Sequence, residues 1–152
     1  MDDDLGVIAA YRHVLEGSEF SRASRVDELS DELYGSSGKL KAEYLDWRVH
    51  YVDQGEDAVA AIFDAAADSD PFTAVFLDIR MPPGIDGYAT AQRIRQIDPN
   101  VHIVFVTAYC DYTEEELWDV AGPIDKTNFM TKPVWPDQLR ETAVGLCNDT
   151  KF

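Results

Sequence analysis

Residues 73–78 read TAVFLD, an almost continuous apolar run that ends in an aspartate. Residues 101–107 (VHIVFVT) and 127–132 (TNFMTK) repeat this design, with a polar side chain directly after each run. Apolar runs of this length are typical of parallel strands covered on both faces. Helical patterns separate and follow these predicted strands, at residues 56–67, 88–97, 113–120 and 136–147. Strands that alternate with helices predict a doubly wound α/β fold around a parallel sheet.

The first third of the chain is less regular. Residues 5–15 predict a helix, and residues 48–52 (RVHYV) predict a strand because β-branched and aromatic residues dominate them. The stretch between them, residues 17–47, is long for a structureless connection, so we interpret it as an insertion that holds a helix or serves a partner. In the helix predicted at residues 56–67, the apolar side chains of Val59, Ile62 and Phe63 are expected on one core-facing side.

Composition restricts the function classes. The 152 residues suit one domain, and the charge sum of 13 − 29 = −16 disfavours direct binding to nucleic acid or to an anionic membrane surface. No apolar run approaches the roughly 20 residues that span a bilayer, and the start MDDD is unlike a basic signal peptide. Cys110 and Cys147 are too few for a disulfide scaffold, so we expect reduced thiols and a cytoplasmic location.

Chemistry-bearing side chains follow the predicted strands. Asp78, Thr107 and Lys132 each come directly after an apolar run, and ligands of open α/β sheets bind at the carboxyl ends of strands. An acidic cluster, residues 2–4, precedes the first helix, and carboxylates suit Mg²⁺. The metal and Lys132 can neutralise a transferring phosphoryl group while Asp78 attacks phosphorus in line. Thr107 can donate its hydroxyl to a phosphoryl oxygen. Together these residues predict a phosphoryl-transfer site.

This arrangement resembles a response-regulator receiver domain (CheY-like) of two-component signalling. MDDDLGVIAAYRHVL resembles the acidic-pair start of the first helix, FLDIRMPPGIDG the phosphoacceptor loop, VTAY the threonine strand end and FMTKPV the lysine–proline motif. The resemblance implies a flavodoxin-like receiver fold over residues 1–148, with the insertion at residues 17–47 and a tail at 149–152.

The resemblance implies a role for each matching residue. Asp78 would be the phosphoacceptor, and Lys132 would contact the phosphoryl group. Asp3 would bind Mg²⁺ directly, Asp2 would bind it through water, and the Arg80 backbone carbonyl would be a further ligand beside Asp78 itself. The cofactor implied is therefore Mg²⁺.

Further roles follow from the same resemblance. Thr107 and Phe129 would form the switch pair, and Lys132–Pro133 would be a cis peptide bond, which X–Pro bonds adopt at small cost. Arg80 and Tyr109 would flank the path of the water that hydrolyses the phosphoaspartate. We interpret both as residues that tune hydrolysis.

Three features depart from the family pattern. One is the connection after the first helix, residues 17–47, which is longer than usual. The loop MPPGIDG looks one residue longer than the common form. The acidic pair normally follows a hydrophobic first strand, and here only Met1 precedes it, so the fold is predicted to lack most of that strand. The pattern leaves open whether the chain is shortened, its start is misassigned, or another segment supplies the strand. We expect the sheet to pair differently or to associate through the gap, for example as a homodimer.

The resemblance implies a phosphorelay module that catalyses only its own phosphorylation and dephosphorylation. Its partners would be a sensor histidine kinase or phosphotransfer protein and a downstream effector domain or protein. One alternative is a receiver-like interaction module with impaired phosphorylation, because residues 2–4 could also be a solvated helix cap. Another is a phosphatase of the haloacid dehalogenase type. That class needs an aspartate two residues after its nucleophile, where this chain has Arg80.

Overall fold

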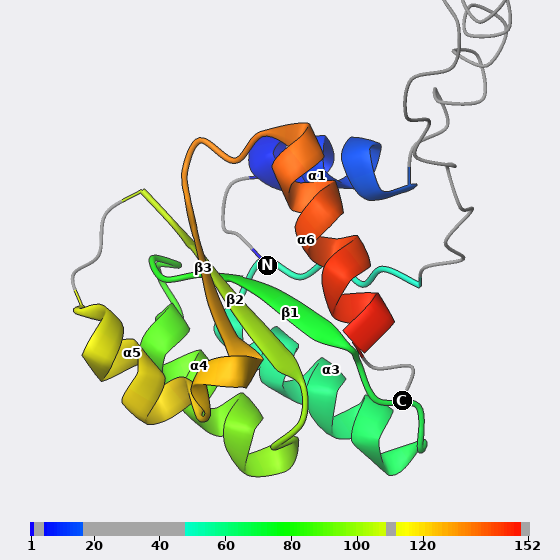
Figure 1. Cartoon of the computed structure of the whole chain (residues 1–152). Coiled ribbons are helices and arrows are strands. Elements are labelled where there is room, and N and C mark those ends of the chain that lie inside the picture. Colours follow the sequence, from blue (N-terminus) through cyan, green and yellow to red (C-terminus); the bar gives the residue numbers. More distant parts are fainter. Residues whose placement is uncertain (2–4, 17–47, 109–111, 150–152) are drawn as a thin grey trace, which may run out of the picture.

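The computed structural model describes residues 1, 5–16, 48–108 and 112–149, which form a parallel sheet between two layers of helices (Figure 1). The strands are β1 (Ala74–Asp78), β2 (His102–Thr107) and β3 (Thr127–Thr131), in the order β1-β2-β3. Leu77 lies opposite Phe105, and Phe105 lies opposite Phe129, so the three strands end at the same edge of the sheet. The predicted α/β class is confirmed.

Helices cover both faces of the sheet. On one face α3, α4 and α5 pack side by side over a core that includes Leu77, Ile103 and Phe105. On the other face α6, with α1 beside it, covers Val104 and Val106. The bounds are α1 (Leu5–Glu16), α3 (Gly55–Ala67), α4 (Gly87–Ile97), α5 (Glu114–Ala121), the 3₁₀ turn η1 (Ile124–Lys126) and α6 (Pro136–Asp149). The helices and strands predicted at these places end within two residues of these bounds.

Local sequence signals explain where α5 begins. The Thr113 hydroxyl accepts a hydrogen bond from the Glu116 N–H at 3.2 Å, and the Glu116 carboxylate accepts one from the Thr113 N–H at 2.7 Å. This reciprocal capping box satisfies two N–H groups that a helix start otherwise leaves unpaired. Thr113 is therefore the N-cap of α5.

Two expectations about the second quarter of the chain are wrong. Residues 48–52 form no strand, because no neighbouring strand lies between them and β1 in the described residues. Phe63 is 60% exposed, whereas Ile62 is buried and Val59 is half-buried against the core. Helix α3 packs through Ala58 and Ile62, and this turns the Phe63 side chain towards solvent.

The edge of the sheet next to β1 carries a single paired residue. The Met1 amino group donates to the Phe76 carbonyl at 2.6 Å, and the Asp78 N–H donates to the Met1 carbonyl at 3.1 Å. These two bonds flank Leu77, which is the pairing of one residue in a parallel ladder. The described residues therefore contain a three-stranded sheet with one residue in place of a fourth strand, in agreement with the predicted lack of most of the first strand.

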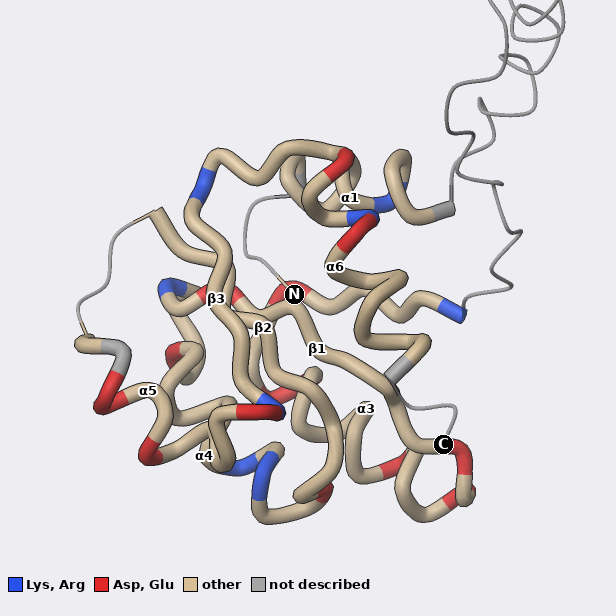
Figure 2. The backbone as a smooth tube through the Cα atoms, viewed as in Figure 1, with Lys and Arg blue, Asp and Glu red and all other residues tan. Residues whose placement is uncertain are grey.

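Charged residues lie on the helices and loops that surround the sheet. Figure 2 shows acidic positions on α3 and α5, while β2 and β3 carry none. In the described ranges no helix combines the length and the apolar character needed to cross a membrane.

Candidate functional site

Three predicted site residues meet at the carboxyl ends of the strands. Asp78 is the last residue of β1 and pairs in register with Val106, so Thr107 at the end of β2 lies one position further along. Thr107 pairs with Thr131, the residue before Lys132, and the Lys132 N–H donates to the Thr107 carbonyl at 2.9 Å. The register of the sheet thus brings together groups that are far apart in the sequence.

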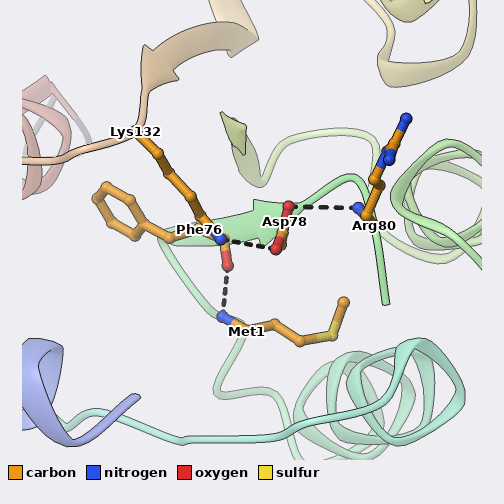
Figure 3. Close-up of polar contacts among 5 residues, drawn as sticks. All are labelled: Met1, Phe76, Asp78, Arg80 and Lys132. Atoms are coloured by element: carbon orange, nitrogen blue, oxygen red, sulfur yellow. Dashed lines mark hydrogen bonds and ion pairs between the residues drawn. The ribbon is translucent and has the colours of Figure 1, made fainter. Parts of the chain in front are cut away.

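The Asp78 carboxylate is held by two contacts (Figure 3). Lys132 Nζ donates to Asp78 Oδ2 at 2.7 Å, and the Arg80 N–H donates to Asp78 Oδ1 at 3.2 Å. Asp78 is 6% exposed, and a buried carboxylate needs such partners because leaving water is costly for a charge. The Lys132 ammonium is half-buried, so it reaches both the carboxylate and solvent. The site pairs a fixed carboxylate with a cation.

The loop after β1 is tied to its surroundings at several points. Ile79 and Met81 are buried in the core, and the Gly87 N–H donates to the Ile79 carbonyl at 2.8 Å. A side chain at Gly87 would bring its Cβ to 2.4 Å from the Asp78 carbonyl oxygen, so this close approach requires glycine. From the start of α3, Gln54 Oε1 accepts from the Gly84 N–H at 3.2 Å. The loop that follows Asp78 therefore has a defined course.

Asp86 and Tyr112 link this loop to the segment before α5, and the sequence analysis missed this link. Asp86 Oδ1 accepts from the Ala89 N–H at 2.9 Å as the N-cap of α4, and Asp86 Oδ2 accepts from the Tyr112 hydroxyl at 2.9 Å. The Tyr112 ring stacks on Tyr88, with the ring centroids 4.8 Å apart. Asp-Gly before a helical pattern signalled the cap, but the tyrosine contact joins residues 26 positions apart.

The predicted switch residue Phe129 lies in the middle of β3 and is half-buried. Its ring stacks on Phe105 with centroids 5.7 Å apart and meets Trp118 of α5 edge-on at 5.9 Å. This packing connects β3, β2 and α5 on one face of the sheet. The predicted cis peptide bond at Lys132–Pro133 is confirmed, and Pro82–Pro83 is a second one.

Other predicted site residues lie outside the described residues. Asp2, Asp3 and Tyr109 belong to this group. Cys110, expected to be a reduced thiol, also lies outside the described residues. Arg80 is described and its side chain is exposed. Within the part of the chain that the structure describes, no three Asp, Glu, His or Cys side chains cluster closely enough to hold a metal ion. The predicted metal and hydrolysis-tuning roles therefore stay predictions.

Comparison with known proteins agrees with this geometry. A sequence model of the response regulator receiver domain matches residues 37–144. The hybrid signal transduction histidine kinase L of Dictyostelium discoideum is 33% identical over 98 residues. That match covers 61% of this chain and 5% of the relative, so the chain spans only a small part of that protein's length.

Solved structures share the fold at low sequence identity. A CheY-like response regulator receiver domain protein from Methanospirillum hungatei has a TM-score of 0.64 and 19% identity, covering 99% of this chain and 92% of that one. The receiver domain of NtrX from Brucella abortus has a TM-score of 0.60 and 21% identity, covering 98% and 96%.

Three observations indicate the same family. They are the side chains at the strand ends, the parallel sheet between two helical layers, and the match over residues 37–144. The fold class and the resemblance expected from the sequence are confirmed. The chain belongs to the response regulator receiver domain family of two-component signal transduction.

Proposed function

We propose that this receiver accepts a phosphoryl group on the Asp78 carboxylate. The observation that carries the proposal is the contact of 2.7 Å between Lys132 Nζ and Asp78 Oδ2 at the carboxyl ends of adjacent strands. Receiver family membership supports a donor that carries phosphohistidine, either a sensor histidine kinase or a phosphotransfer protein. A small acyl phosphate has the same reactive group and serves as the laboratory donor.

The residues at the strand ends suit an in-line displacement at phosphorus. An Asp78 carboxylate oxygen forms the new P–O bond while the P–N bond to the donor histidine breaks, and the histidine nitrogen keeps that electron pair. Lys132 then contacts a phosphoryl oxygen in place of its bond to Asp78, so the ammonium charge stays paired. The Thr107 hydroxyl donates to another phosphoryl oxygen. The chain catalyses only the gain and loss of its own phosphoryl group.

Oxygen donors at the end of β1 fit Mg²⁺. The Asp78 carboxylate and the Arg80 carbonyl are hard oxygen ligands, and Mg²⁺ keeps several waters and needs only a few protein groups. We include Asp3 as a direct ligand and Asp2 through water, because the carbonyl of the preceding Met1 accepts from the Asp78 N–H at 3.1 Å. When bound, the ion supplies positive charge against the phosphoryl oxygens.

Phosphorylation is proposed to act on a partner through Thr107 and Phe129. When the Thr107 hydroxyl turns towards the phosphoryl group, the volume that it leaves allows the Phe129 ring to move. The Phe129 ring contacts Phe105 and Trp118, so a change at this ring reaches α5. An effector domain or protein in the cytoplasm would recognise the altered surface. We place the receiver domain at residues 1–148, with the insertion at residues 17–47.

Phosphorylation with radiolabelled acetyl phosphate tests the proposal. The wild type with Mg²⁺ is expected to incorporate label, and Asp78→Asn or addition of EDTA is expected to abolish incorporation. Asp119→Asn, which changes an exposed aspartate on α5, is the matched control and should be labelled like the wild type. Equal labelling of Asp78→Asn and wild type would overturn the assignment. A wild type that takes no label from acetyl phosphate or a phosphohistidine donor would favour the interaction module with impaired phosphorylation.

A further inference from the structure

A hydrogen bond at the start of α5 joins this helix to the loop that follows Asp78. The Tyr112 hydroxyl donates to Asp86 Oδ2 at 2.9 Å. The Tyr112 ring also stacks on Tyr88 of α4, with the ring centroids 4.8 Å apart and the ring planes 21° from parallel. Both rings are half-buried and pack against the main core cluster. Tyr112 directly precedes Thr113, the N-cap of α5, so the bond acts on the first turn of this helix.

The acceptor Asp86 is itself firmly held by α4. Its Oδ1 accepts from the Ala89 N–H at 2.9 Å, which makes it the N-cap of α4. Its carbonyl accepts from the Thr90 N–H at 3.0 Å and from the Thr90 hydroxyl at 2.7 Å, and Thr90 is completely buried. Because α4 fixes the position of Asp86, its second carboxylate oxygen can hold another element in place. That element is α5.

Short backbone contacts join Asp86 to Asp78. The Gly87 N–H donates to the Ile79 carbonyl at 2.8 Å, and a Cβ on Gly87 would lie 2.4 Å from the Asp78 carbonyl oxygen. The chain directly after Asp86 therefore lies against the end of β1. The Arg80 N–H donates to Asp78 Oδ1 at 3.2 Å, so the carboxylate itself is bonded to this loop. A change in the contacts of the Asp78 carboxylate thus acts on the loop to which Tyr112 is bonded.

The switch described under the proposed function acts on the same helix. Phe129 meets Trp118 of α5 edge-on, with the ring centroids 5.9 Å apart. A helix as short as α5 moves as a unit, so a displacement of Trp118 also displaces the start of the helix. Hydrogen bonds have a narrow range of distances, about 2.7–3.2 Å, and a shift of about 1 Å breaks them. A displacement of α5 by the switch therefore competes with the bond between Tyr112 and Asp86.

We propose that Tyr112, through its bond to Asp86, is a positioning residue that opposes the displacement of α5 by phosphorylation. This inference rests on the proposed phosphorylation of Asp78. The bond belongs to the arrangement before phosphoryl transfer, because Lys132 contacts Asp78 itself at 2.7 Å, and the proposed reaction replaces this contact. A hydrogen bond to a carboxylate is stronger than one between neutral groups. Its loss between two positions of a helix changes their equilibrium by about tenfold.

Variants that remove the bond but keep the rings and the helix cap test this proposal. Tyr112→Phe keeps the stack on Tyr88 and loses the donor, while Asp86→Ser keeps an N-cap residue and loses the second acceptor oxygen. Each variant should take label from acetyl phosphate with Mg²⁺ about tenfold faster than the wild type, because the arrangement of α5 that phosphorylation favours is already more populated. The double variant should be no faster than either single variant, since both changes remove one bond. Tyr88→Phe removes the neighbouring hydroxyl and is the matched control, which should label like the wild type.

A second measurement needs no phosphoryl donor. NMR relaxation dispersion of the Trp118 indole reports exchange between two positions of α5, because this ring contacts Phe129. The population of the minor position should be about tenfold larger in Tyr112→Phe and in Asp86→Ser than in the wild type, and unchanged in Tyr88→Phe. A bond that only stabilises the fold would lower the free energy of unfolding in urea but change neither this population nor the labelling rate. If Tyr112→Phe does not fold, Asp86→Ser serves for both measurements.

The outcomes distinguish this inference from the proposed function. Labelling that depends on Asp78 but is equal or slower in Tyr112→Phe would overturn the inference and leave the proposed function intact. Additive effects in the double variant, or exchange at Trp118 that is absent or equal in all proteins, would overturn the inference as well. A wild type that takes no label, together with larger exchange in both variants, would overturn the proposed function and leave Tyr112 as the residue that positions α5.

Discussion

The Asp78 carboxylate and the Lys132 ammonium neutralise each other in a setting that is buried on the carboxylate side. Such a pair is costly to break by removing one partner, because the other charge is left without compensation. In the proposed reaction an incoming phosphoryl group would provide that compensation, since it carries its own negative oxygens. The ion pair therefore holds both side chains in place. In the proposed reaction Lys132 can exchange its contact with Asp78 for one with a phosphoryl oxygen.

Lys132 gives the first residue-scale prediction. We expect Lys132→Ala to lower the rate of labelling by about 100-fold, the loss typical of removing one group that stabilises developing charge. Mg²⁺ binding should be retained, because a cation is removed and no oxygen ligand is lost. Stopped-flow labelling and Mg²⁺ titration of the intrinsic tryptophan fluorescence measure the two effects. Lys126→Ala, on the turn η1, is the control and should label like the wild type. An unchanged rate in Lys132→Ala would contradict the assigned role.

Arg80 and Tyr109 give the second residue-scale prediction, on the lifetime of the phosphorylated state. Both side chains are large and can hydrogen-bond, so we expect them to hold the hydrolytic water out of line, and in-line placement is most of what phosphoryl transfer requires. The double variant Arg80→Ala, Tyr109→Ala should then lose phosphate faster than the wild type. Decay of labelled protein after removal of the donor measures this rate. Equal decay in both proteins would show that the two residues do not shield the site.

Hydrogen bonds at helix ends and in loops fix the positions of neighbouring elements around the core. Arg95 on α4 donates to the carbonyls of Ala121, Pro99 at 2.7 Å and Val101 at 2.9 Å, which joins the end of α5 to the start of β2. Burial lowers the pKa of Arg95, against the opposing charges of nearby aspartates. An arginine stays charged after such a shift, so this cluster stabilises the junction at all ordinary pH values.

Gly122, directly after α5, gives the element-scale prediction. Its φ of 88° and ψ of −153° suit glycine alone, and a Cβ there would lie 2.8 Å from Arg95 Nε. Gly122→Ala is expected to lower the free energy of unfolding by about 2 kcal/mol. The control is Gly145→Ala on α6, where a Cβ meets nothing within 4 Å. That change should raise the stability by up to about 1 kcal/mol, because alanine favours helix. Urea unfolding measures whether each variant has a lower or a higher free energy of unfolding than the wild type. Equal changes in the two variants would contradict this explanation.

The elements also show what the sequence could predict. Asp78, Thr107 and Lys132 were predictable because each follows an apolar run whose end is visible in the sequence, and parallel strands align their carboxyl ends. The strand expected at residues 48–52 was wrong because strand formation depends on a neighbour, and local composition does not reveal one. The contact of Tyr112 with Asp86 and the pairing of Met1 with Leu77 are tertiary, so no local pattern indicates them.

Charge is the dominant property of the whole molecule. The net charge of −16 on 152 residues produces self-repulsion that is relieved on unfolding, when the charges move apart. Acidic positions on α3 and α5 lie on the same side of the sheet, as Figure 2 shows, so part of this repulsion acts between neighbouring elements.

The whole-molecule prediction is that salt stabilises the fold. Raising KCl from 0.1 M to 1 M shortens the screening length from about 10 Å to about 3 Å, which weakens repulsion between carboxylates on different elements. The short contact between Lys132 and Asp78 is buried on the carboxylate side and is screened much less, so the balance favours the folded state. Thermal unfolding should therefore shift to higher temperature with salt. Asp119→Lys places a positive charge in the last turn of α5, changes the net charge from −16 to −14 and removes an unfavourable helix-end charge. At 0.1 M KCl this variant should have a higher melting temperature than the wild type, and its melting temperature should rise less when salt is added. A melting temperature that falls with KCl, or an equal gain in wild type and variant, would show that self-repulsion does not limit the stability of this domain.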